Sequence, residues 1–242
     1  MDIKQGHTEL DKTLEDYKIS AGLRLKIRSY LNRNKIFIDG EWIEKKRPSI
    51  EEYVLRKYCR EEMNFDQFFK IYNHFLEEQG IPFDENIYIT DTSKRAREKF
   101  IRESNIVLYN WSNSIRSYKI DERDYSELYE TINLEGYENT ELSTYKIMMD
   151  FPELMKRYDI RNQYELHNLL RKTVDIEKMN DIEFGKMPTI HFGKFDRDAM
   201  IKQILVNNSP ITMDEITNIL LEDYGYDPRV SRGTYLTCIS EY

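Results

Sequence analysis

The amino-acid sequence predicts a mainly α-helical protein with small β-hairpins, arranged as tandem units of one design. The first observation is a pattern that marks a helix start and occurs three times, as MNFDQF (63–68), MDFPEL (149–154) and ITMDEI (211–216). The second is a set of strand-like runs around short turns, which end near residues 45, 120 and 193. A spacing of roughly 75 residues suits an array of small domains.

The composition limits the class of protein. The chain has 242 residues, of which 40% are hydrophobic, so a packed core is possible. A formal net charge of −8 argues mildly against tight nonspecific binding to nucleic acid, although local patches decide binding. Cys59 and Cys238 lack metal-ligand spacing, and we expect free thiols in a reducing compartment. No leader or membrane-length apolar run occurs, so we expect a soluble cytoplasmic protein without a membrane partner.

The clearest helix start is ITMDEI. Thr212 is expected to be the N-cap and Glu215 the third helical residue, so that each side chain accepts a bond from the other residue's backbone N–H. Ile211 and Ile216 then form a hydrophobic staple across the cap. Gly225 is expected to end the helix, because glycine accepts the left-handed backbone common at that position.

The other two copies predict the same start. Asn64 would cap the first, with Gln67 as the third helical residue, and Asp150 would cap the second, with Glu153 in that place. A preceding helix is expected before each stapled helix, at 49–62, 141–149 and 195–208. A third helix is expected after each, at 93–104, 162–174 and 228–242.

Hairpins complete the pattern. Strand-like runs follow the first two third helices, at 105–120 and 181–193. Near the N-terminus a helical run at 22–34 leads into alternating runs on both sides of Asp39-Gly40, which is a strong signal for a two-residue hairpin turn. The acidic segment 121–141 does not fit the pattern and is expected to be either an inserted helix or a linker.

A unit of three helices and a hairpin resembles the winged helix-turn-helix class. Residues 1–47 are predicted to form a partial winged-helix-like unit, and residues 48–120 a complete one. Residues 121–194 are predicted to form a further winged-helix-like unit with an acidic extra helix. Residues 195–242 are predicted to form a C-terminal helix-turn-helix unit without a wing. Because the outer units look incomplete, we expect a fragment of a longer protein. The resemblance implies DNA binding through the third helix, although many winged-helix domains bind proteins instead.

Two predicted third helices carry candidate DNA contacts. Arg95, Lys99 and Arg102 follow one another at helical spacing and form a basic stripe that could neutralise phosphates. On the later helix, Tyr164, Asn168 and Arg171 are expected opposite the leucine side, together with Lys172. Asparagine can bond adenine and arginine can bond guanine. The alternative for both patterns is an ordinary solvated helix face.

Further basic residues complete the candidate interface. Arg229 and Arg232 lie near the start of the last predicted helix, where readers of DNA often contact it. Arg24, Lys26 and Arg28 lie on the flanks of the N-terminal helix, in the most basic region of the chain.

Catalytic and cofactor motifs are not evident. The four histidines lack partners at zinc-ligand spacing, and there is no phosphate-cradling glycine-rich loop or nucleophile elbow. We therefore expect no enzyme activity, cofactor or metal in this stretch of chain.

Two functions follow. The first is a DNA-binding module of an intracellular regulatory or DNA-processing protein, from a bacterium by its Lys-, Asn-, Ile- and Tyr-rich usage. The alternative is a protein-interaction scaffold of winged-helix-like units, with 121–141 as an acidic docking surface. The net charge favours the scaffold, and the basic helices favour DNA.

Overall fold

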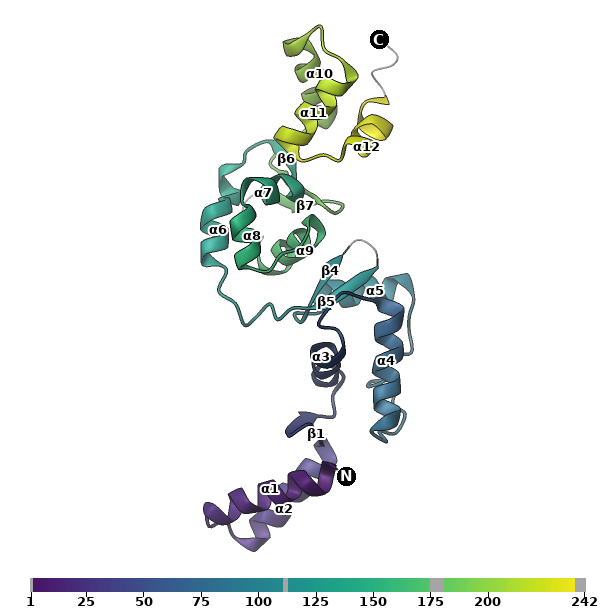
Figure 1. Ribbon diagram of the computed structural model, residues 1–242, viewed down its shortest axis with the longest axis vertical. Coiled ribbons are helices and arrows are strands. Elements are labelled where there is room, and N and C mark those ends of the chain that lie inside the picture. Colours follow the sequence, from purple (N-terminus) through teal and green to yellow (C-terminus); the bar gives the residue numbers. More distant parts are fainter. Residues whose placement is uncertain (1, 111–112, 175–180, 238–242) are drawn as a thin grey trace. The chain divides into compact units, whose positions relative to one another are not determined.

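The computed structural model describes residues 2–110, 113–174 and 181–237 (Figure 1). The fold is mainly helical with small antiparallel sheets of two or three strands, as predicted. The chain divides into two compact units, which comprise residues 1–100 with 114–117, and residues 101–113 with 118–242. The predicted division into four units, at 1–47, 48–120, 121–194 and 195–242, stays a prediction. Within the described ranges, no helix has both the length and the apolar character needed to cross a bilayer.

The first unit begins with two helices and a hairpin, which are α1 (Asp2–Asp16), α2 (Ala21–Asn34), β1 (Lys35–Ile38) and β2 (Glu41–Glu44). The strands pair from Lys35 opposite Glu44 to Ile38 opposite Glu41. Asp39 and Gly40 form the turn with φ of 49° and 85°, so the predicted two-residue hairpin is confirmed.

The elements that follow are α3 (Arg47–Tyr58), β3 (Met63–Asn64), α4 (Phe65–Glu78), α5 (Lys94–Glu103), β4 (Val107–Asn110) and β5 (Ser114–Ser117). The predicted cap of α4 is confirmed, because the Asn64 side chain accepts a bond from the Asp66 N–H at 2.9 Å. The apolar side of α4 fills the core, where Phe65 and Phe68 meet Phe100 of α5 with ring centroids 5.9 and 5.7 Å apart.

The second unit continues with α6 (Ser126–Ile132), a 3₁₀ turn (Leu134–Gly136), β6 (Thr140–Ser143), α7 (Thr144–Asp150), α8 (Pro152–Arg157), α9 (Gln163–Thr173), β7 (Ile182–Phe184) and β8 (Thr189–Phe192). Its core is built from the apolar residues of α6 to α9 and of the sheet. Three further elements follow, α10 (Arg197–Asn208), α11 (Met213–Tyr224) and α12 (Pro228–Val230), and then a π-helical turn (Ser231–Tyr235).

One order of elements occurs twice. A helix, a short strand, helices and two strands appear as α3 to β5 and again as α6 to β8. The first strand pairs with the last in both cases, so the sheets run β3-β5-β4 and β6-β8-β7. The acidic segment 121–141, which was expected to be an inserted helix or a linker, contains α6. Its helix α6 takes the first position of the repeat and buries Leu128 and Ile132.

The repeat is aligned differently from the prediction. The helix expected at 141–149 begins only at Thr144, because residues 140–143 form β6. Asp150 ends α7 instead of capping a helix, and its carboxylate accepts a bond from Lys146 at 2.6 Å. Phe151 precedes a proline, which disfavours helical backbone at that point. The residue that corresponds to Asn64 is Ser143, which ends β6 and caps α7 by accepting from the Tyr145 N–H.

The last helix start is confirmed. Thr212 and Glu215 form the predicted capping box, and Gly225 ends α11 in the left-handed region with φ of 72°. Asp227 then caps α12. The single helix expected at 228–242 is instead α12 and the π-helical turn, and residues 238–242, with Cys238, lie outside the described residues. Cys59 is a buried free thiol.

Candidate functional site

Helix α5 presents the predicted basic stripe. None of its residues is buried, and Arg95, Lys99 and Arg102 are all exposed. The half-buried Phe100 anchors the opposite side of the helix against α4. Arg97, on the same helix, donates to Asp66 at 2.6 Å. The stripe therefore lies on the outer side of a helix that is fixed by an aromatic contact and an ion pair.

Helix α9 differs from the prediction. Every residue from Glu165 to Leu170 is buried, because β4 of the same unit packs on the side that was expected to be open. The Asn168 side chain is 2% exposed and accepts a bond from the Tyr109 N–H at 3.3 Å. Reading of bases by Asn168 is thus a wrong prediction. Tyr164 is half-buried, and Arg171 is exposed.

Two basic side chains on α9 are held in apolar surroundings. Lys172 Nζ donates to the carbonyls of Ser104 and Val107 at 2.6 and 3.0 Å, and burial lowers the pKa of this lysine to about 7. His167 is fully buried, with Nε2 3.1 Å from the Thr189 carbonyl. Burial lowers the pKa of His167 to about 4, so this ring is neutral near pH 7. Both contacts hold α9 in place and leave little of it for DNA.

Tyr164 and Arg229 come together at a pocket of about 590 Å³ in the second unit. Tyr164 lies at the start of α9, and Arg229 lies on α12. Lys186, in the turn between β7 and β8, is exposed on the same lining. This volume is typical of sites for small molecules.

A buried carboxylate lies beside this pocket. Glu141 of β6 is 1% exposed and accepts bonds from Arg197 Nε and Nη2 at 3.0 and 2.5 Å. The Tyr226 hydroxyl donates to the same oxygen at 2.7 Å, and His191 Nδ1 lies 2.8 Å from the other oxygen. Arg197 also stacks on Tyr235, 4.3 Å from the ring centroid. A buried charge needs such partners to be stable.

The sequence pattern does not predict this network. It places Glu141 at the start of a helix at 141–149 and His191 in a strand-like run at 181–193. In the structure both are strand residues, and they face each other across the β6–β8 ladder. A single acid between Thr140 and Leu142 in a short strand was the available signal, but the pairing partner could not be known from local sequence.

Most of the predicted cations are paired with carboxylates, and Arg102 of the α5 stripe contacts Glu103 at 3.2 Å. Arg24 contacts Glu15 at 3.0 Å, and Arg28 contacts Asp11. Arg232 contacts Asp214 at 2.6 Å. Arg229 and Asp227 make two bonds, at 2.9 and 3.2 Å. Lys26 is exposed on α2. These pairs lower the positive potential that the arginines could offer to a phosphate backbone.

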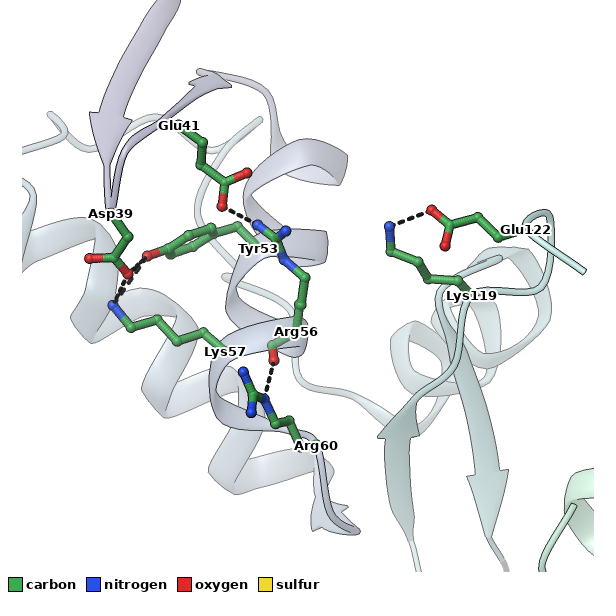
Figure 2. Close-up of polar contacts among 8 residues, drawn as sticks. All are labelled: Asp39, Glu41, Tyr53, Arg56, Lys57, Arg60, Lys119 and Glu122. Carbon is green, nitrogen blue, oxygen red and sulfur yellow. Dashed lines mark hydrogen bonds and ion pairs between the residues drawn. The ribbon is translucent and has the colours of Figure 1, made fainter. Parts of the chain in front are cut away.

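Two basic residues of α3, Arg56 and Lys57, are also paired with carboxylates (Figure 2). Lys57 Nζ and the Tyr53 hydroxyl both donate to Asp39 at 2.6 Å. The bonds from Lys57 and Tyr53 hold the pKa of the Asp39 carboxyl below its usual value. Arg56 of α3 is paired with Glu41 of β2. These contacts join the hairpin to α3 and serve its structure.

Another labelled pair lies in the second unit. Lys119 and Glu122 are 2.5 Å apart and belong to one loop (Figure 2).

Among the described residues, no cluster of histidine, cysteine, aspartate and glutamate is arranged to hold a metal ion. Compared with family models, curated proteins and solved structures, the chain matches none.

Proposed function

We propose that the chain is a DNA-binding module of tandem winged-helix-like units, in which α5 of the first repeat contacts duplex DNA. The observation that supports it most is the exposed stripe of Arg95, Lys99 and Arg102 on the third helix of the repeat. Third helices of this class enter the major groove. The matching order of elements and sheets in both repeats supports the class. α9 has a structural role in this proposal.

The test is the salt dependence of duplex binding, followed by fluorescence anisotropy. The triple variant Arg95→Ala, Lys99→Ala, Arg102→Ala should bind all sequences more weakly. The slope of log affinity against log salt should fall by about 1 for each lost phosphate contact. The control is Lys70→Ala, Lys194→Ala, Lys202→Ala, which removes the same charge from exposed positions elsewhere. Equal slopes in the two triple variants would contradict the role of α5.

A protein-interaction scaffold is the second candidate. The pairing of Arg24, Arg28 and Arg232 with carboxylates favours it, and so does the burial of α9. The acidic side chains of 121–141 stay exposed on α6 and its flanks, including Glu130, Glu135 and Glu138. If the chain does not bind duplex DNA even at low salt, this result would favour the scaffold. Charge reversal at these three glutamates would then test the docking surface.

A further inference from the structure

The pocket in the second unit has a rigid floor without a net charge of its own. Glu141 and Arg197 compensate each other, and Tyr226 and Tyr235 enclose the guanidinium at 5.8 and 4.3 Å. His191 is fixed by Glu141 through Nδ1, and its Nε2 lies beside Gly185. An added Cβ at Gly185 would lie 2.4 Å from Nε2, so glycine leaves room for the ring. The floor is thus preformed, as binding sites for small ligands usually are.

Two basic residues and an aromatic ring are among the residues that line the pocket. Lys186 is exposed on the turn between β7 and β8, and the Arg229 side chain is 92% exposed on α12. Asp227, which also lines the pocket, accepts bonds from Arg229 Nε and Nη2. The carboxylate offsets part of the positive charge of Arg229, and it holds in place a group that carries five N–H donors. Tyr164, at the start of α9, lines the same pocket. Positive donors beside a flat ring can bind a phosphate and stack an aromatic base.

We propose that this pocket binds a nucleoside monophosphate, with Lys186 and Arg229 at the phosphate and Tyr164 against the base. The combination selects this class of ligand, since a bare phosphate would use only the cations and a nucleoside only the ring. The pocket volume of about 590 Å³ suits a ligand of this size. The Gln163 and Thr234 side chains also line the pocket and can bond the sugar hydroxyls. None of these residues belongs to α5, so the site is separate from the proposed DNA contact.

Isothermal titration calorimetry of the full chain tests the proposal, with adenosine 5′-monophosphate as the probe. Adenosine and inorganic phosphate are titrated separately, and each should bind at least about tenfold more weakly than the nucleotide, because each lacks one set of contacts. Lys186→Ala and Arg229→Ala should each weaken the nucleotide about tenfold or more. Both side chains are exposed, so these variants should fold normally.

Matched variants separate the roles of the residues. Tyr164→Phe should keep nucleotide binding and Tyr164→Ala should lose most of it, because the ring and not the hydroxyl stacks on the base. Lys194→Ala, an exposed lysine outside the pocket lining, should bind like the unmodified chain. The proposal is overturned if the chain shows no nucleotide binding at millimolar concentration, if inorganic phosphate binds as tightly as the nucleotide, or if Lys194→Ala weakens binding as much as Lys186→Ala.

Discussion

At the scale of single residues, short polar side chains decide where the helices begin. Asn64 and Thr212 were predictable as caps because a cap depends only on the next three residues. Asp150 has the same local context, yet Pro152, two residues later, disfavours helical backbone at Phe151 and leaves Asp150 at the end of α7. Asn168 could not be placed correctly, because its burial comes from Tyr109, a residue far away in the sequence.

The capping box of α11 gives a prediction at this scale. Thr212→Ala removes the acceptor for the Glu215 N–H, which lies 3.2 Å from the hydroxyl oxygen, and should lower the free energy of unfolding by about 1 kcal/mol. Thr212→Asp and Thr212→Ser keep an acceptor and should be nearly neutral. Urea unfolding followed by circular dichroism measures the difference. Identical midpoints for Thr212→Ala and Thr212→Ser would show that the hydroxyl does not stabilise the helix.

At the scale of elements, the surroundings of a helix determine what it can do. The hairpins and the helices with strong caps follow from local sequence, because their turns and periodicity are local. The roles of α5 and α9 do not follow from it. Both have polar sequences, and each is the last helix before two strands of a repeat. β4 packs against α9, whereas none of the residues of α5 is buried. Strand β6 was assigned to a helix because four residues are too short to show alternation clearly.

The contact of α9 with β4 gives a pH-dependent prediction through Lys172. The folded pKa of about 7 lies below the ordinary lysine pKa of 10.5, so the unfolded chain binds an additional proton between these values. Stability should therefore rise with pH in this window, by up to about 1.4 kcal/mol per pH unit. Lys172→Met removes the titrating group, and the stability difference between the variant and the unmodified chain should change with this slope between pH 7.5 and 9.5.

Urea unfolding at several pH values measures this slope. The matched control is Lys70→Met, since Lys70 is exposed on α4 and should not change the pH dependence. Parallel stability profiles for Lys172→Met and the unmodified chain would mean that Lys172 keeps its proton in the fold.

At the scale of the molecule, the two units differ in how much could be predicted. The mainly helical class and the recurrence of an element order were predictable, since both depend on patterns summed along the chain. The division of the chain into two compact units was not predictable, because it depends on packing between distant segments. In the second unit, Glu141 joins β6 to α10 and to Tyr226 through bonds that cross up to 85 positions of sequence. Such long-range polar networks leave no local pattern.

This network gives a prediction for the cohesion of the second unit. Arg197→Met leaves the carboxylate of Glu141 buried without its cation and should lower stability by about 3 kcal/mol or more. The double variant Glu141→Leu, Arg197→Met removes both charges and should lose less than the sum of the two single variants. A double-mutant cycle by urea unfolding gives the coupling energy, and additive losses would show that the two side chains act independently.

The caps at the ends of β3 and β6 have a consequence for strand alignment. Asn64 and Ser143 are each the last residue of a strand, paired with Ser114 and Thr189, and also the residue that starts the next helix. If either strand slipped by one position, its cap would leave the helix start and the apolar side chains would change faces. Two-residue and four-residue strands specify their own alignment only weakly. In this chain, the first turn of the following helix therefore fixes the register of each strand pair.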